Sequence, residues 1–576
     1  MGIMKSTASG MAGQHFVLTP LGGGREIGGN AWHIEWDDLS FLIDCGTHPE
    51  RPAWLGLPAL DRIARLDFVI LTHAHSDHSG ALPALLRSHP VPVWMTDATS
   101  SLMGPMMQDA LKLQRRFFDI DRFGRSARPE LGPPLFESGD VERVFELQKS
   151  LDGGFSHKGL TVTPFCSGHI LGGVGLVLEK NSKRVLVTSD ISDIPKETSR
   201  ALFLPQGNFD LVISEGTRGL DCGDTDLPLR EDEEEQAIRI LSRVLSRKGS
   251  VLFPAFVIER AQSVARLVMR ARDSGRIPPG VPLYMAGLAD SMTALHAQAL
   301  GLRLDWKPVP SRDWFDDLLS REQAILVAGS GMLNSGSGAA RLAEQLLSDR
   351  KREHGIIFTG YLTPQSPGGR LMHRERSPLS GHTHACINQR IVDVRTNEIH
   401  QVHLSCHASG DSLVDLVRGL EPAGVILVHG DPDALATLSA AMRLAGLTDI
   451  RVPENGESIS FSGNPAATLI PPLDPSAEPM TVVERNPWNG RALRALAGEN
   501  AILPDGESAR NRLQSITNLL LERAMRDGNL GRAKSILDES GSFIPGDDRE
   551  AITLRIDEIA AWCPQNDDRT PNQRRD

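Results

Sequence analysis

Four side chains that can bind metal ions stand close together in the run His73-Ala-His75-Ser-Asp77-His78. Imidazole and carboxylate groups are typical ligands of zinc and similar ions. Because Asp77 cannot easily share an ion with His73 and His75, we expect Asp77 and His78 to face a second ion. A lone histidine is usually a structural residue, but four ligand-type residues at this spacing disfavour that interpretation. The run therefore predicts a site for two metal ions.

The pattern HxHxDH of this run resembles the signature of the metallo-β-lactamase superfamily. Further residues resemble the other motifs of that family, in the same order along the chain. Asp44 resembles the carboxylate of the first motif, which orients the metal ligands. His169 resembles the third motif, and Asp190 resembles the fourth. The resemblance implies that the Asp190 carboxylate bridges both metals.

Three residues later in the chain resemble motifs of one branch of this superfamily, the β-CASP nucleases. Glu215 resembles the acidic motif A, His407 resembles motif B, and His429 resembles motif C. Between motifs A and B lies an insertion of roughly 190 residues, where the branch carries its β-CASP domain. Histidine at motif C marks the RNA-directed members, such as ribonuclease J and the pre-mRNA 3′-end endonuclease, whereas DNA-repair members usually have valine. The resemblance therefore implies an RNA substrate.

The family mechanism follows from these residues as an expectation. A water that bridges two zinc ions, with Mn²⁺ as an alternative metal, attacks phosphorus, and His407, held by Glu215, protonates the departing 3′ oxygen. The products carry a 5′-phosphate and a 3′-hydroxyl. The residues expected to be catalytic are Asp77, His407, Glu215 and Asp44. The expected metal ligands are His73, His75 and His169 on one ion, Asp77, His78 and His429 on the other, and Asp190 on both.

The insertion carries matches of its own. Phe253–Phe256 followed by Arg260-Ala-Gln262 is similar to the FPAFxxxRAQ segment of the branch, Gly329–Met332 to its glycine-rich loop, and Thr359–Tyr361 to its GY turn. Backbone amides of the glycine-rich loop can cradle a phosphate, although a plain turn is the alternative interpretation. The residues expected to bind substrate are Ser330, Gly331, Met332, Arg260 and Tyr361.

Two positions depart from the family pattern. Ser409 stands two residues after His407, where the family usually has Asp. Glu259 stands before Arg260, where glycine is common. We interpret the first difference as a change in the surroundings of His407 and the second as peripheral.

Short apolar runs precede most of these polar residues and predict the strands that position them. The runs 41–43, 68–71, 184–187 and 211–213 each end at or near a candidate site residue, and similar runs follow at 402–404 and 425–428. Polar residues that follow the strands of a rigid sheet form a common enzyme layout. We therefore expect the candidate residues to meet at one edge of the sheets.

The insertion has a different pattern. An acidic stretch from Arg230 opens an amphipathic helix, which suits the dipole at a helix N-terminus. Apolar runs at 251–256, 282–285, 324–328 and 356–359 alternate with helical segments. This alternation is typical of βαβ units around a parallel sheet.

The expected fold class is α/β: a metallo-β-lactamase αββα sandwich with an inserted β-CASP domain, a parallel α/β sheet, and a small helical C-terminal region. A proline-rich stretch after residue 470 indicates a linker. The expected divisions are 15–217 and 401–470 for the two parts of the metallo-β-lactamase domain, 218–400 for the β-CASP domain, 471–505 for the linker, 506–565 for the helical region and 566–576 for a disordered tail.

The composition of the chain limits its class and its partners. Of its 576 residues, 40% are hydrophobic and 23% charged, as in a soluble globular protein, and the net charge of −12 argues against a protein that coats nucleic acid. The six cysteines form no CxxC pair and suit a reducing compartment. No apolar run can span a bilayer, so we expect a cytoplasmic protein without membrane contact. Residues 506–565 are the candidate surface for a homodimer or a protein partner.

Other functions remain open on this pattern. A DNA nuclease or a hydrolase of small phosphodiesters would share the fold and the ligands. A non-catalytic scaffold subunit is a third alternative, but it requires broken ligands, and none is broken. The motifs do not distinguish an endonuclease from a 5′-exonuclease.

Overall fold

The computed structural model describes residues 15–51, 55–118, 134–309, 323–364, 366–373, 383–388, 390–394 and 398–461. Apart from 115–118, these residues fall in one compact unit, which is formed by 1–114 and 134–478. The expected linker 471–505, helical region 506–565 and tail 566–576 lie outside the described residues. Among the described helices, none has the length and apolar character that a membrane span requires.

Two seven-stranded sheets pack face to face. Their facing side chains, among them Trp32 and Phe41 from the first sheet and Ile213 from the second, form one buried core. The first sheet has the order β22 (Ile459–Phe461), β1 (Phe16–Gly22), β2 (Ala31–Trp36), β3 (Leu39–Ile43), β4 (Phe68–Ile70), β5 (Val93–Met95) and β6 (Gln148–Ser150). The second has the order β21 (Ile450–Arg451), β20 (Gly424–Val428), β11 (Leu211–Glu215), β10 (Lys183–Val187), β9 (Val174–Lys180), β8 (Leu160–Cys166) and β7 (Phe155–His157).

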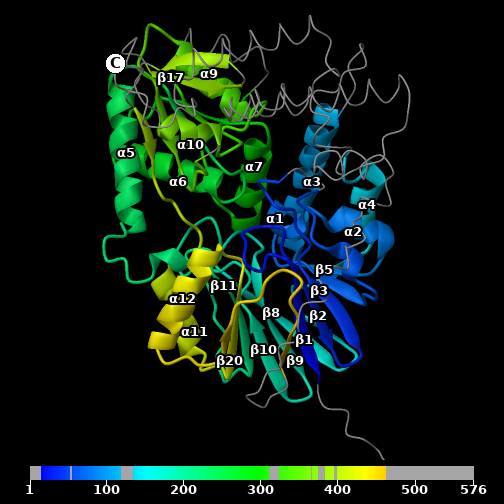
Figure 1. Ribbon diagram of the computed structural model, residues 1–576. Helices are drawn as coiled ribbons and strands as arrows, with labels where there is room; N and C mark the ends of the chain where they lie inside the picture. Colours follow the sequence, from blue (N-terminus) through cyan, green and yellow to red (C-terminus); the bar gives the residue numbers. More distant parts are fainter. Residues whose placement is uncertain are drawn as a thin grey trace, which may run out of the picture. The chain divides into compact units, whose positions relative to one another are not determined.

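Helices cover the outer faces of both sheets. Buried side chains of α2 (Leu82–Ser88), α3 (Asp97–Phe118) and α4 (Ser138–Glu146) form a core with the outer face of the first sheet. Those of α11 (Gly410–Gly419) and α12 (Pro432–Leu444) do the same on the second, as the yellow helices beside β20 show in Figure 1. Central strands such as β3 are buried along their whole length because both faces are covered. This arrangement confirms the expected αββα sandwich.

A third sheet is built from the insertion, and its paired strands run parallel. Its order is β14 (Lys307–Pro308), β13 (Leu283–Ala286), β15 (Ile325–Ala328), β12 (Val251–Pro254), β16 (Gly355–Phe358) and β19 (Ile399–Gln401). Helices α5 (Arg230–Ser246), α6 (Arg260–Asp273) and α7 (Leu288–Leu300) contribute to the core on one face. The other face packs against α9 (Gly338–Ser348), α10 (Pro367–Met372) and the hairpin of β17 (Thr383–Ile387) and β18 (Arg390–Val394). The parallel α/β sheet expected for the insertion is thus present.

One predicted strand is misplaced. We expected a strand at 402–404, but the strand in this region is β19, Ile399–Gln401. Its last residue, Gln401, pairs with Phe358, the last residue of β16, so the ladder ends where its partner ends. The apolar residues that follow are buried without belonging to a strand.

Candidate metal centre

The ends of neighbouring strands gather the candidate residues. Strands β10, β11 and β20 are parallel neighbours, so their carboxyl ends share one edge of the second sheet. Asp190 follows β10, Glu215 ends β11, and His429 follows β20. The run that contains His73 follows β4 of the first sheet, and its later part forms the short helix α1 (Ser76–Ser79). The expected meeting of polar residues at strand ends is observed.

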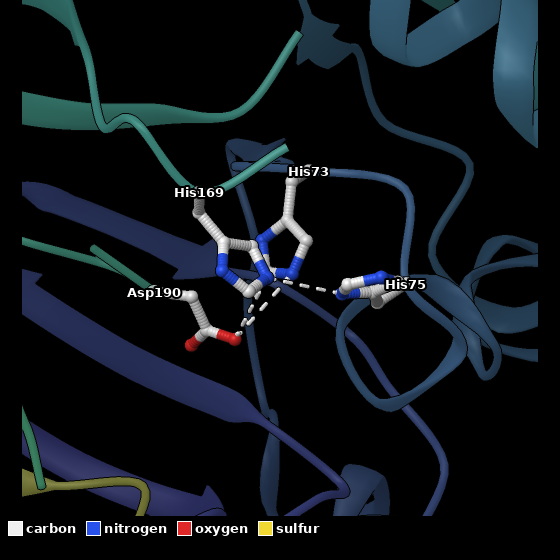
Figure 2. A group of neighbouring side chains, drawn as sticks. All are labelled: His73, His75, His169 and Asp190. Atoms are coloured by element: carbon white, nitrogen blue, oxygen red, sulfur yellow. Dashed lines mark hydrogen bonds and ion pairs between the residues drawn. The ribbon is translucent and has the colours of Figure 1, made fainter. Parts of the chain in front are cut away.

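The first group of ligand-type side chains consists of His73, His75, His169 and Asp190, whose ligand atoms all lie within 4.8 Å of one another. Figure 2 shows the imidazole rings and the carboxylate pointing toward a common centre. Asp190 Oδ2 lies 3.7 Å from His73 Nε2 and 3.5 Å from His169 Nε2. His169 Nε2 lies 3.2 Å from His75 Nδ1.

The second group consists of Asp77, His78 and His429, which also meet within 4.8 Å. Here it is the other carboxylate oxygen of Asp190 that approaches: Oδ1 lies 3.4 Å from His78 Nε2 and 3.4 Å from His429 Nε2. Asp77 Oδ2 lies 3.7 Å and 3.9 Å from the same two nitrogens. Asp190 therefore presents one oxygen to each group.

These separations fit the donors of a metal ion. Zinc–nitrogen bonds of about 2.0–2.1 Å place two tetrahedral donors about 3.4 Å apart, which is longer than most hydrogen bonds. Among the described residues, His73 Nε2 and Asp190 Oδ1 are buried without a hydrogen-bond partner. A buried polar atom without a partner is costly unless something else satisfies it. The two groups are therefore suited to two cations that share one carboxylate.

Asp44 holds the second group in place. Its Oδ2 accepts hydrogen bonds from His78 Nδ1 at 2.7 Å and from Thr72 Oγ1 at 2.9 Å, and its Oδ1 accepts one from the Thr72 amide at 2.8 Å. The bond to Nδ1 turns the His78 Nε2 atom toward Asp190. This contact to a ligand is the one that the sequence led us to expect for Asp44.

Sequence reasoning missed Asn30. Its side-chain amide lies 2.9 Å from His78 Nε2, and its backbone amide donates to the Asp77 carbonyl at 2.8 Å. Asn30 follows the glycine-rich stretch 22–29. A polar residue directly after several glycines was the pattern that could have indicated Asn30 as a candidate site residue.

The electrostatics of the first group favour neutral imidazoles. Burial lowers the pKa of His73 and of His169 well below the usual value, and burial lowers that of His75 to about 4. Burial raises the pKa of Asp190, but His429 and His78 lower it well below the usual range, so its carboxylate is ionised. Neutral imidazole and ionised carboxylate are the forms that bind metal.

His407 and Glu215 form a pair beside the metal centre. Both carboxylate oxygens of Glu215 lie 3.2 Å from His407 Nδ1. Although burial lowers the pKa of His407, Glu215 and Asp190 raise it to about 9. Side-chain exposure is 19% for His407 and 21% for Asp77, against at most 2% for Asp190 and His429, so a substrate can touch these two residues.

The two departures from the family pattern have different outcomes. Ser409 caps helix α11, because its hydroxyl accepts a hydrogen bond from the Ser412 amide. The interpretation of Glu259 as peripheral is wrong. Its side chain is fully buried and accepts a hydrogen bond from Thr198, which follows the Asp190 loop in the sequence.

The expected substrate residues lie at three places in the insertion. The loop after β15 contains Ser330, Gly331 and Met332, and the Met332 amide donates to the Ser330 hydroxyl at 3.2 Å. Arg260 is buried at the start of α6. Tyr361 follows β16 and is 65% exposed, and partial burial together with the charges of Asp431 and Glu50 raises its pKa. Substrate binding by all five residues stays a prediction.

Two family descriptions match this chain. Residues 24–202 match the metallo-beta-lactamase superfamily, and residues 391–453 match the Zn-dependent metallo-hydrolase RNA specificity domain. The first range contains Asp44 to Asp190, and the second contains His407 and His429.

Curated proteins similar to this chain come from eukaryotes and from archaea. Cleavage and polyadenylation specificity factor subunit 3-I of Arabidopsis thaliana is 24% identical over 477 residues, 78% of this chain and 65% of that protein. Transcription termination factor FttA of Pyrococcus horikoshii is 28% identical over 483 residues, 77% of this chain and 70% of that protein. Endoribonuclease ysh1 of Aspergillus fumigatus is 23% identical over 524 residues, 79% of this chain and 57% of that protein. The matches thus span between 57% and 70% of the length of each of these relatives.

Proposed function

Because this chain belongs to the metallo-β-lactamase superfamily, we propose that it is a zinc-dependent ribonuclease of the β-CASP branch that hydrolyses RNA phosphodiester bonds. The observation that carries the proposal is the Asp190 carboxylate, which presents one oxygen to each of two ligand groups beside the His407–Glu215 pair. The expected products carry a 5′-phosphate and a 3′-hydroxyl.

The chain offers ligands for two zinc ions. Bound zinc would supply Lewis acidity, which would activate water as a nucleophile near neutral pH and neutralise charge on phosphoryl oxygens. Asp44 orients His78, and the Cys406 carbonyl accepts a hydrogen bond from His169 Nδ1 at 2.9 Å. The residues that would hold the ions are His73, His75 and His169 for one, Asp77, His78 and His429 for the other, and Asp190 for both.

His407 is placed to act as the general acid. With a pKa of about 9, its imidazole carries two protons at neutral pH. The Nδ1 proton is held by Glu215, which leaves the Nε2 proton for the 3′ oxygen as that atom departs. Glu215 is itself fixed, because its Oε1 accepts a hydrogen bond from the Ile191 amide at 2.8 Å.

RNA is the substrate class that the comparisons support best. Residues 391–453 match an RNA specificity domain, and one relative is named an endoribonuclease. His429 agrees with this choice through the resemblance at motif C. A DNA nuclease and a small-molecule phosphodiesterase remain alternatives with the same ligands, whereas a scaffold subunit is opposed by the complete ligand set. A cytoplasmic location and a homodimer or protein contact through 506–565 remain predictions.

The test is a parallel digestion of an end-labelled single-stranded RNA and a DNA of the same sequence. We compare the wild type with Asp77→Asn, and we use Asp415→Asn as the matched control, since Asp415 is 69% exposed on α11. Mutation of a residue that supports a metal ligand typically lowers metal affinity or activity by about 10–100-fold. Loss of a ligand itself should therefore slow RNA cleavage by at least about 100-fold, whereas the control variant should cleave RNA at the wild-type rate. Full activity of Asp77→Asn would contradict the proposal, and faster cleavage of DNA than of RNA would favour the DNA nuclease.

A further inference from the structure

Residues 196–199, here called the coupling segment, lie between the Asp190 loop and helix α6. Two of them contact the backbone around the metal ligand His169. The Lys196 ammonium donates a hydrogen bond to the His169 carbonyl at 2.7 Å, and the Ser199 hydroxyl donates one to the Gly168 carbonyl at 3.2 Å. The segment therefore holds the loop that carries this ligand.

The other two residues of the segment contact the insertion. The Thr198 hydroxyl donates to Glu259 Oε1, and Glu197 forms an ion pair with Arg266 of α6. Glu259 precedes the first residue of α6, and its carboxylate lies 3.4 Å from the Ser263 hydroxyl one turn into the helix. One short segment thus connects α6 with the His169 loop.

The connection is buried and charged. Glu259 and Thr198 are at most 2% exposed, so their contact is shielded from water. Such an interaction is stronger in a buried site than at the surface.

The backbone of Glu259 supports a specific role for its side chain. Its φ is 72°, in the left-handed region that favours glycine. A non-glycine residue there is strained, and such strain persists where the surrounding contacts impose it. Glycine would relieve the strain but would lack the carboxylate that Thr198 contacts.

We propose that Lys196 and Glu259 are positioning residues through which helix α6 of the insertion controls the placement of the metal ligand His169. The proposal rests on the proposed function, because it assumes that His169 holds zinc. His169 is then held from two sides: Cys406 fixes its ring at Nδ1, and Lys196 fixes its carbonyl. Neither positioning residue belongs to the ligand groups.

The test measures zinc retention by the full-length protein against a competing chelator. The variants are Lys196→Met, Glu259→Gln, the combination of both, and Lys196→Arg as the conservative rescue. The control is Asp305→Asn, which removes the ion pair of Arg272 on the same helix at a site 76% exposed. Absorption of the cobalt-substituted protein reports the ligand geometry, and thermal unfolding shows that each variant is folded.

We expect Lys196→Met to weaken zinc binding by about 10–100-fold, as for other groups that support metal ligands, and to change the cobalt spectrum. Glu259→Gln should weaken binding less, and Lys196→Arg should restore most of it. Since Glu259 and Lys196 act through the same coupling segment, the double variant should lose no more than Lys196→Met alone, whereas independent effects would multiply. The control should bind zinc as the wild type does.

A folded Lys196→Met variant that retains zinc like the wild type would overturn the proposal, as would losses that multiply in the double variant. If Lys196→Met does not fold, the Thr198→Val variant tests the proposal in its place, because it removes only the hydrogen bond to Glu259. Weaker zinc binding by Thr198→Val supports the proposal, and unchanged zinc binding overturns it. A wild-type protein that binds no zinc would refute the proposed function instead.

Discussion

At the scale of single residues, two members of the candidate metal centre have strained backbone conformations. The backbone φ angles of Asp44 and His429 are 61° and 51°. These values lie in the left-handed region, which residues other than glycine rarely adopt. Each is fixed by its neighbours: the Asp44 amide donates to the Ile70 carbonyl, and the His429 amide donates to the Gly23 carbonyl. Strain of this kind gathers at functional sites, where the surrounding structure imposes it.

The Glu215→Gln variant tests the general acid. Glu215 raises the pKa of His407, which reaches about 9, so a neutral amide should lower that pKa. A group with a raised pKa is protonated below that pH and loses its proton as the pH rises through it. The alkaline limb of the kcat/KM profile on labelled RNA should therefore move to lower pH, by about one unit or more.

Glu179→Gln is the matched control for this prediction, since Glu179 is 42% exposed and pairs with Arg184 away from the site. Its profile should coincide with that of the wild type. An unmoved alkaline limb in Glu215→Gln would show that His407 does not supply the proton.

At the scale of elements, the loop after β3 and the loop after β4 are joined by backbone hydrogen bonds. The Cys45 amide donates to the His78 carbonyl at 2.7 Å, and the Thr47 amide donates to the Ser76 carbonyl at 3.0 Å. The two loops approach most closely at Gly46, where a Cβ atom would lie 1.7 Å from the Asp77 carbonyl oxygen. Only glycine permits this approach without displacing Asp77 and His78.

Gly46→Ala should therefore be costly. The added methyl group must push the Asp77–His78 backbone away, and forced packing of this kind costs about 1–3 kcal/mol. We expect a lower free energy of unfolding by chemical denaturation, together with weaker zinc binding, because both ligands move. Gly153→Ala is the control, since a Cβ there meets nothing within 4 Å. Equal stability of the two variants would contradict the close approach.

At the scale of the whole molecule, the ligand groups join the two sheets. His73 to His78 follow a strand of the first sheet, whereas Asp190 and His429 follow strands of the second. The insertion lies in the sequence between Asp190 and His429. A metal that binds both sets of residues therefore connects the two halves of the sandwich.

Removal of the metal should lower the melting temperature of the protein. A ligand that binds only the folded state stabilises it by about 2.7 kcal/mol at a free concentration of 100 times its Kd. In calorimetric scans, the wild type should melt at a lower temperature with a chelator than without one. Asp190→Asn should melt at the same temperature in both, because the carboxylate shared by both groups is gone. A wild-type protein insensitive to the chelator would argue against metal at this site.

The sequence by itself determined the ligand run, the strand ends and the α/β class. Each of these depends on local spacing: four ligand types within 73–78, and apolar runs that end at polar residues. A strand buried on both faces must be apolar, and its end must leave the core, so such patterns can be read without coordinates.

The tertiary structure alone decided the long-range pairings. That Asp190 presents separate oxygens to the two groups, that Asn30 contacts His78 and that Glu259 reaches Thr198 depends on segments distant in sequence. The strand at 399–401 is likewise set by its partner β16 rather than by its own composition. Local spacing limits what a residue can do, but only the packing of remote segments determines which atoms meet.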